Sequence, residues 1–367
     1  MKALILTPDQ IRRMKVRTLE NPPQMTVRLE AHEMHWQIVG PDGRVVREAE
    51  QPIHNLILSQ TYTSLLPTHG IIPLNQYAVV GTGSTAPNSS QTGLVSELAR
   101  TGSVPAGESD QAQFVSAGVY DIRRVKEFTE AQVGSQNLTE WGFSPSASAG
   151  ANLMCRELFR DGSSNPITLT IASDQKLRLI YKMRVTIGPT TVQAVTVNIG
   201  GEGPGNRTAK FIVTNRMGAL SGGGSLDSNP IYGGIIFPID SNTGDLQAAH
   251  CLIKGVNGDG SGYNSLRFHI GAATDAAPTT YGHATSWLSP HLGLGSLTHA
   301  APSGRSRQSS FLANTATFNG SIKSVCLSCN NAYNGLTPTI NLVFDSGQEF
   351  TKANTHKLLI ANYQITW

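Results

Sequence analysis

A glycine-rich loop, residues 81–87, follows the apolar run 77–80 and is the first candidate for a binding site in this sequence. This is the position of a phosphate-binding loop. A dinucleotide fingerprint needs a third glycine or an alanine that opens a helix, but Ala86 is followed by proline and polar residues. A P-loop needs Gly-Lys-Ser/Thr, and no lysine lies between Lys15 and Lys126. We interpret the loop as a tight connection leaving a strand.

A cysteine pair, Cys326 and Cys329, has the spacing of half a zinc site or of a redox pair. A zinc ribbon needs a second such pair, or two histidines at a suitable distance, and the sequence offers neither. The surrounding residues instead favour a strand that ends at a turn formed by Asn330 and Asn331. We therefore interpret the cysteines as partly buried thiols and predict no metal and no cofactor.

Three histidines, His283, His291 and His299, are spaced eight residues apart in a segment rich in loop-forming residues. A metal site normally shows a tighter pair, so a loop is the favoured interpretation. The same segment contains Tyr281 and Trp287, and an exposed aromatic ring there could stack on a sugar or anchor a protein contact. We name Tyr281, Trp287 and His291 as candidate receptor or partner contacts; burial of Trp287 in the core is the alternative.

A catalytic constellation is not evident. In residues 258–262, Gly-Asp-Gly-Ser-Gly, the serine lies directly between two glycines, whereas a nucleophile elbow needs Gly-x-Ser-x-Gly. The same run resembles the start of a calcium loop, but Asn257 and Phe268 stand where carboxylates are needed. Carboxylates can meet in space, yet no acidic cluster indicates glycoside hydrolysis. We predict no catalytic residues and a protein that is not an enzyme.

Composition indicates the fold class. Only 14% of the 367 residues are charged, and the chain has 37 glycines and 19 prolines. Such a composition favours an all-β protein with many turns and a surface that is polar through hydroxyls and amides. A surface with few charges is readily buried against other subunits, because few ions lose water. A weakly charged secreted monomer is the alternative.

The charge balance and hydropathy exclude two classes of partner. A net charge of +3 is too small for nucleic-acid binding, and no segment has the 18 or so consecutive apolar residues of a membrane span. The main basic cluster is Arg12, Arg13, Lys15 and Arg17. It lacks the aromatic or glycine-rich context of a phosphate-binding arm, so we predict a solvated or subunit-facing segment that serves in docking.

Periodicity predicts the strands. Residues 25–30 alternate apolar and polar, and residues 35–47 indicate a hairpin with its turn at Pro41-Asp42-Gly43. Further strands are predicted at 76–80, 114–120, 122–128, 137–143, 166–171, 176–187, 191–199, 235–237, 266–270 and 357–367. Helix is expected only near 8–19, where an extended arm is the alternative, and near 90–100.

These elements predict an all-β fold of β-sandwich domains in tandem with a small N-terminal hairpin and arm unit. The three predicted units are a docking arm and hairpin at 1–54, a β-sandwich with the glycine-rich loop at 55–190, and a β-rich domain with long loops at 191–367.

The apolar run near the N-terminus is too short for a signal peptide. Four cysteines are too few for disulfides to stabilise a chain of this length, which indicates assembly in a reducing cytosol.

An ordered series of short segments resembles tail-associated structural proteins of tailed bacteriophages. The series covers residues 54–58, 63–66, 77–87, 92–94, 97–100, 128–131, 138–143, 158–162, 166–170 and 176–181. Its characteristic pieces are an Asn-Leu-Ile segment, the Gly-Thr-Gly-Ser-Thr-Ala-Pro loop and the segment Glu-Leu-Ala-Arg. Each piece is short, so their order carries the resemblance.

The resemblance implies a non-enzymatic virion component of a fibre, baseplate or tail tip, made in the host cytoplasm. It also implies a homo-oligomer, expected to be a homotrimer, whose partners are other phage tail proteins and a host-surface glycan or protein. A tail-associated polysaccharide-degrading enzyme and a carbohydrate-binding module are the alternatives.

Overall fold

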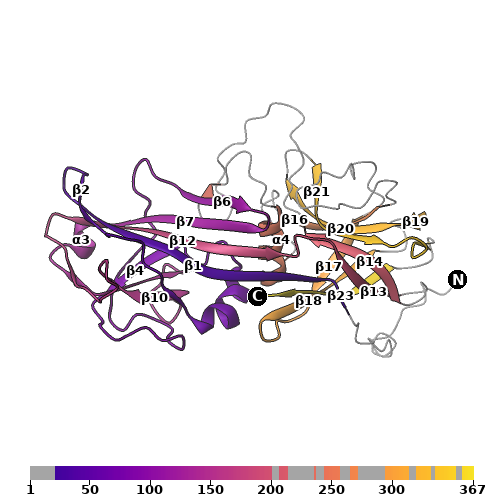
Figure 1. The fold of residues 1–367 in the computed structure, drawn as a ribbon, viewed down its shortest axis with the longest axis horizontal. Coiled ribbons are helices and arrows are strands. Elements are labelled where there is room, and N and C mark those ends of the chain that lie inside the picture. The colour runs from indigo at the N-terminus through magenta and orange to yellow at the C-terminus, as the bar shows by residue number, and fades with distance from the viewer. Residues whose placement is uncertain are drawn as a thin grey trace.

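The computed structural model describes residues 21–200, 206–213, 235–236, 244–256, 265–271, 294–313, 320–331, 335–352 and 358–367. Within these ranges the chain is mostly β-strand, arranged in several antiparallel sheets, which confirms the predicted all-β class. Figure 1 shows an elongated molecule in which the early strands occupy one end and the late strands the other.

Four strands form the N-terminal part of the largest sheet: β1 (Gln24–Val39), β12 (Lys176–Gly188), β7 (Val119–Phe128) and β6 (Asp110–Ser116), in this spatial order. β12 pairs antiparallel with β1 on one side and β7 on the other. Its residues alternate between buried and half-buried along its whole length, so one face packs on the core and the other meets solvent. The strands predicted at 25–30, 122–128 and 176–187 are confirmed here. The single strand predicted at 114–120 is wrong: β6 ends at Ser116, and a turn at residues 117–118, with Gly118 at φ 69°, leads into β7.

The hairpin predicted at residues 35–47 is confirmed. β2 (Val45–Glu48) pairs antiparallel with the end of β1, and Gly40 and Arg44 close the turn with a 2.8 Å backbone hydrogen bond. Gly43 lies in this turn at φ 80°, a conformation that glycine adopts without steric cost.

A second sheet of five strands packs against β12. Its spatial order is β3 (Leu56–Ile57), β10 (Cys155–Leu158), β9 (Glu140–Ser144), β4 (Tyr77–Gly81) and β5 (Glu97–Thr101). Trp141 and Phe143 of β9 lie 6.1 and 4.6 Å from the ring of Tyr181 on β12, measured between ring centroids. The two sheets therefore share one core.

The helix predicted near residues 90–100 is wrong. Residues 97–101 form β5, which pairs antiparallel with β4 and thereby satisfies its backbone hydrogen bonds. The apolar spacing that suggested a helix has another cause, because Leu94 packs into a small core on the outer face of the five-stranded sheet. The helix or arm predicted near 8–19 lies outside the described residues.

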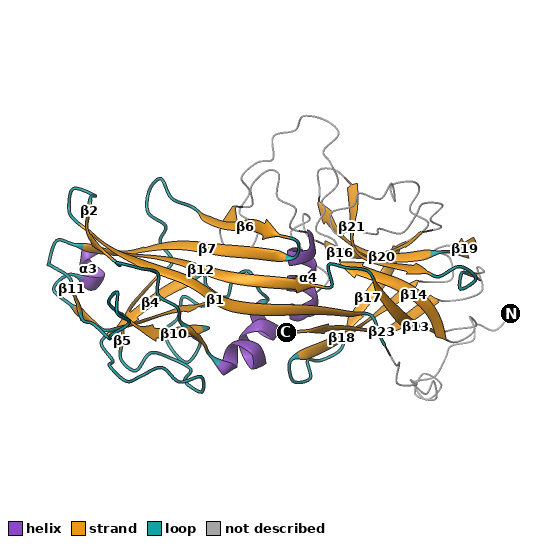
Figure 2. Ribbon diagram, in the orientation of Figure 1, coloured by secondary structure: helices purple, strands orange, loops and turns teal. Residues whose placement is uncertain are grey.

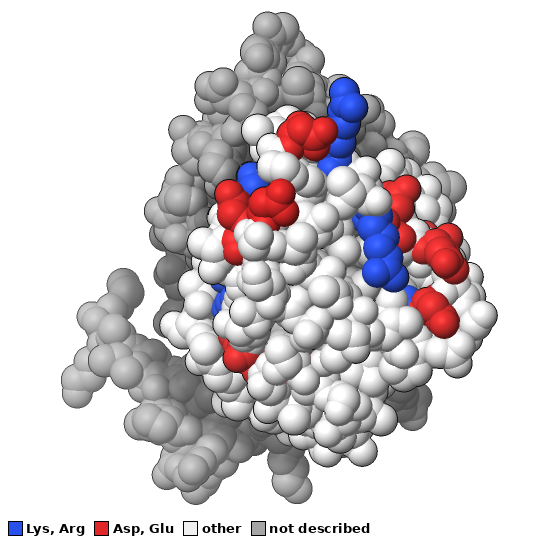
Figure 3. All heavy atoms as spheres, turned by 90° about the vertical axis from the view of Figure 1, so that its left-hand side faces the viewer, with Lys and Arg blue, Asp and Glu red and all other residues white. Residues whose placement is uncertain are grey.

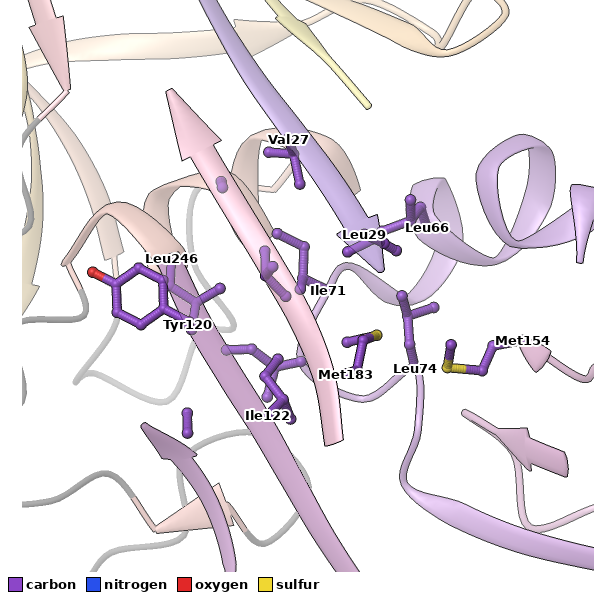
Figure 4. Packing of buried hydrophobic residues seen from close by; sticks show 14 of the residues in the cluster. Val27, Leu29, Leu66, Ile71, Leu74, Tyr120, Ile122, Met154, Met183 and Leu246 are labelled. Atoms are coloured by element: carbon purple, nitrogen blue, oxygen red, sulfur yellow. The ribbon is translucent and has the colours of Figure 1, made fainter. Parts of the chain in front are cut away.

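The described helices are short, as Figure 2 shows. They are the π-helix η1 (Thr61–Leu65), α2 (Leu66–His69), α3 (Glu130–Val133) and α4 (Gly244–Lys254). Figure 4 shows the core where α2 and α4 meet the long sheet: Leu66 and Ile71 lie beside Leu29 of β1 and Met183 of β12. Leu246 of α4 enters the same core. Segment 61–74 thus connects the N-terminal sheets with the C-terminal region.

The C-terminal strands continue the largest sheet. They are β13 (Gln193–Gly200), β14 (Asn206–Val213), β16 (Ser265–Gly271), β17 (Leu294–His299), β18 (Ser306–Ala313), β20 (Ser324–Asn331), β21 (Gly335–Phe344) and β23 (Leu358–Thr366). The shorter strands are β8 (Asn137–Leu138), β11 (Leu169–Thr170), β15 (Ile235–Ile236), β19 (Gly320–Ile322) and β22 (Phe350–Lys352). Strands predicted near 191–199, 235–237, 266–270 and 357–367 are confirmed.

One predicted turn is wrong. Asn330 and Asn331 belong to β20, where they pair with Leu336 and Gly335 of β21. Backbone pairing with a neighbouring strand extends β20 beyond the point at which its asparagines suggested a turn.

The predicted boundaries between units separate strands that pair with each other in one sheet. β1, from the first predicted unit, pairs with β12 of the second and with β23 of the third. The division into three units stays a prediction. Among the residues that the structure describes, no helix has the length and apolar character needed to cross a membrane.

Candidate functional site

The glycine-rich loop covers the outer face of the five-stranded sheet. Along β4, Ala78 and Val80 face the main core, whereas Val79 faces the opposite side and is fully buried. Val79 forms a small separate core with Leu58 and Leu153, against which Leu94 packs. Two segments thus cover this face: residues 82–96, and residues 144–152 together with Leu153.

A buried carboxylate holds the first segment in place. Glu140 Oε1 accepts hydrogen bonds from the backbone N–H groups of Gly83 at 2.9 Å and Ser96 at 2.8 Å, and Oε2 accepts one from Val95 at 3.1 Å. Successive backbone amides that converge on an anion form the kind of nest that binds phosphate in other loops. Here the anion is the chain's own glutamate, which explains a glycine-rich loop after a strand without any nucleotide.

Arg156 balances this carboxylate. Its Nε and Nη2 atoms lie 2.9 and 2.8 Å from Glu140 Oε2, and both side chains are fully buried. The remaining guanidinium donors reach the loop, to Gln91 Oε1 and the carbonyl oxygen of Thr85, each at 2.8 Å. A buried ion pair is tolerated when its other hydrogen-bonding positions are filled, and these positions are filled by the loop.

The glycines of the loop make room for this arrangement. A Cβ atom on Gly83 would lie 2.4 Å from Glu140 Oε1, and one on Gly81 would lie 2.3 Å from the carbonyl oxygen of Ser96. Only glycine lets the backbone approach the carboxylate this closely.

A second arginine organises residues 144–152. Arg100 on β5 forms a bidentate pair with Glu97, with both N–O distances 3.0 Å. Its Nη1 atom lies 2.7 to 3.0 Å from oxygen atoms of Ser144, Ser146, Ser148 and Asn152. The two segments are neighbours, because Leu153 N donates to the Thr92 carbonyl oxygen at 3.1 Å.

The result is a preformed, uncharged surface, which we call the two-loop surface. It consists of the exposed residues of segments 82–96 and 144–152, which contain no charged and no aromatic residue. Its exposed side chains are mostly hydroxyls, amides and methyl groups. Figure 3 views the end of the molecule at which β2 and α3 lie, and a broad central area there shows no charged atoms. Such a surface can form hydrogen bonds and close contacts, but offers no acid, base or nucleophile of perturbed pKa.

A second buried ionic centre lies on the inner side of β7. Asp110 Oδ2 contacts Arg124 Nη1 at 2.9 Å and Lys126 Nζ at 2.6 Å, so one carboxylate serves two cations. Neutral oxygens complete the centre: Arg124 donates to Asn75 Oδ1 at 3.1 Å and to the Ile72 carbonyl at 2.7 Å. Burial lowers the pKa of Arg124 and of Lys126, and attraction to Asp110 opposes that shift.

The site residues predicted from sequence are not placed by the structure. The docking candidates Arg12, Arg13, Lys15 and Arg17 and the contact candidates Tyr281, Trp287 and His291 all lie outside the described residues. Across the described part of the chain, no group of three or more His, Cys, Asp or Glu side chains could hold a metal ion. Burial raises the pKa of Cys155 to about 12, which makes its thiol unreactive at neutral pH.

The Glu140 centre was missed by residue-by-residue reading, although a signal was present. Glu140 opens the strand-like run Glu-Trp-Gly-Phe, and Arg156 stands beside Cys155 in another predominantly apolar run. A charge in a buried strand needs a partner of opposite sign, and Arg156 was one candidate partner for Glu140. No family model, curated protein or solved structure matches this chain.

Proposed function

We propose that this protein is a non-enzymatic structural component of a phage tail, located in a fibre, the baseplate or the tail tip, and built from tandem β-sandwich domains. It assembles as a homotrimer, contacts other tail proteins, and contributes to attachment at a host-surface glycan or protein. It is made in the host cytoplasm and functions in the virion.

The two-loop surface is the observation that carries this proposal. Two arginines and a glutamate fix both segments before any partner binds, so little conformational entropy is lost on association. The surface has no charge to desolvate and small side chains that allow close approach. These properties suit contact with another protein subunit better than contact with a nucleic acid, which needs cations, or with a sugar, which favours an aromatic platform.

The resemblance to tail proteins gives independent support. Segments 77–87 and 97–100 of the resembling series pair with each other, and segment 77–87 also pairs with segment 138–143, which contains Glu140. A series of motifs that forms one physical unit is more informative than the same motifs scattered over a fold.

Charge insertion tests the surface. Thr85→Arg and Ser148→Arg each place a cation on one exposed segment, and Ser116→Arg places one on exposed β6 as the matched control. We expect the two loop variants to lose incorporation into particles and to shift from trimer to monomer in light scattering, while the control does neither. Normal assembly of both loop variants would contradict the proposal.

The docking arm needs a separate truncation. Removing residues 1–20 deletes Arg12, Arg13, Lys15 and Arg17 while keeping β1, which a longer deletion would remove from the middle of its sheet. We expect a folded protein that incorporates poorly into particles.

The enzymatic alternative is tested by incubating the full chain with host polysaccharide and sizing the products. Reproducible depolymerisation would replace the structural assignment.

A further inference from the structure

β1 of the N-terminal strands and β23 of the C-terminal strands pair over a short stretch, which we call the seam. Only Gln24–Thr26 of β1 pair with Gln364–Thr366 of β23, in parallel. The opposite edge of this part of β23 is occupied by β18, and β13 pairs with β23 further along, at residues 359–361. Three residue pairs are a small contact for joining the long strands in Figure 1 to the C-terminal strands.

Trp367 follows this seam directly and enters the N-terminal half. Its side chain is buried, and its Nε1–H donates to the backbone carbonyl of Tyr62 in η1 at 2.6 Å. The backbone of Trp367 is held as well, because its N–H donates to the carbonyl of Arg305 at 2.9 Å. The Arg305 guanidinium in turn lies 4.3 Å from the centroid of the Tyr62 ring, within range of a cation–π contact.

The helix sequence explains why the Tyr62 carbonyl accepts an indole. In η1 the N–H of Leu66 bonds the carbonyl of Thr61, five residues earlier. The next bond of this pattern would run from residue 67 to Tyr62, and Pro67 has no N–H to donate. The proline therefore leaves a carbonyl that needs another donor, and a carbonyl without one is costly in a partly buried place.

We propose that the hydrogen bond from Trp367 Nε1–H to the Tyr62 carbonyl, which Pro67 leaves without a helical donor, stabilises the pairing of β1 with β23. The N-terminal and C-terminal strands then move as one body. We call this contact the Trp367 plug. Other contacts also join the halves: Leu246 of α4 lies in the shared core, β15 pairs with β6, and His250 Nδ1 on α4 accepts a hydrogen bond from Ile72 N at 3.3 Å. Loss of the plug therefore loosens the seam without separating the halves.

Hydrogen exchange on the full chain tests the plug. Trp367→Phe removes the donor, and Trp36→Phe is the matched control, because Trp36 is a buried indole on β1 whose Nε1 has no hydrogen-bond partner within the described residues. We expect Trp367→Phe to speed hydrogen exchange of the backbone amides at residues 24–26 and 364–366 about five- to tenfold. The backbone amides in the β12–β7 pairing are the internal reference. We expect Trp36→Phe to produce no such selective change.

Two further variants separate the hydrogen bond from ring packing. Benzothienylalanine at 367 keeps the bicyclic ring and lacks the N–H, so it should loosen the seam as the phenylalanine does. Pro67→Ala restores a backbone donor for Tyr62, and in this background Trp367→Phe should speed seam exchange much less. The proposal is overturned if Trp367→Phe does not loosen the seam selectively, or if Pro67→Ala leaves its effect unchanged.

Discussion

The Glu140 centre and the Asp110 centre place a buried carboxylate beside a buried arginine, yet they differ in charge balance. Glu140 has one cationic partner, Arg156, and its remaining acceptor positions take backbone amides of the loop. Asp110 has two cationic partners, Arg124 and Lys126, so this centre carries an excess positive charge.

The difference explains what each centre does. The Glu140 pair is neutral and most of its donors and acceptors belong to loop backbone, so it determines the shape of a surface. The Asp110 centre joins β6, β7 and segment 72–75 inside the sheet, and neutral oxygens rather than a second carboxylate offset its extra charge. Each partner of the Glu140 pair is therefore indispensable, whereas one cation of the Asp110 centre is surplus.

The largest effect is expected for Arg156→Met. This change leaves the Glu140 carboxylate buried without a counter-ion, and breaking a buried pair costs about 3–5 kcal/mol of unfolding free energy. Urea denaturation measures the loss. The double variant Glu140→Gln with Arg156→Met should be more stable than Arg156→Met alone, because no unpaired charge remains and the amide oxygen can still accept hydrogen bonds from the loop. A double variant less stable than the single one would show that the ions act through shape rather than charge.

Next in size is Gly83→Ala. Its new methyl group would lie 2.4 Å from Glu140 Oε1, so the loop must shift, at a cost of about 1–3 kcal/mol. Gly93→Ala is the control in the same loop, since the nearest atom to its added methyl group is the Gly150 carbonyl oxygen at 3.5 Å. Equal stability of the two variants in urea denaturation would contradict a tight contact between the loop and the carboxylate.

A smaller effect is expected for Lys126→Met. Asp110 keeps Arg124 as its partner and the surplus cation is removed, so we expect a loss of about 1 kcal/mol, the net contribution of one hydrogen bond. The same denaturation series compares it with Arg156→Met. Similar losses of unfolding free energy for Lys126→Met and Arg156→Met would contradict the proposed difference in charge balance between the two centres.

The smallest effect concerns His299, a half-buried basic group near Arg307. Burial, with a further contribution from Arg307, lowers the pKa of His299 to about 4. The pKa of histidine in the unfolded chain is about 6.5, so the unfolded state takes up the proton first as the pH falls. Stability from neutral His299 is thus present above about pH 6.5 and is lost as the pH falls toward 4.

His299→Gln should flatten this acid dependence, because glutamine does not titrate. Thermal unfolding between pH 4 and pH 7 would compare the variant with the parent chain. A parent chain that loses no more stability than His299→Gln over this range would exclude His299 as an acid-sensitive group.

Local pattern predicted most of the strands. The alternation in β12 and the Pro-Asp-Gly turn before β2 specify strand and hairpin through side-chain period and backbone conformation, which neighbouring residues largely fix. Pattern failed at residues 90–100, where the apolar spacing of a helix belongs to a loop and to β5. There, pairing with β4 and packing of Leu94 on the small core of Leu58, Val79 and Leu153 outweigh local preference.

Local pattern was enough to predict the β class, the hairpin turn and a glycine-rich loop free of charges. Long-range packing was needed to show that this loop encloses Glu140 and Arg156, and that Trp367 reaches Tyr62 across the fold. The physical reason is range: strand alternation and turn conformation arise from adjacent residues, whereas a buried charge or an orphaned carbonyl finds its partner only when packing brings distant segments together.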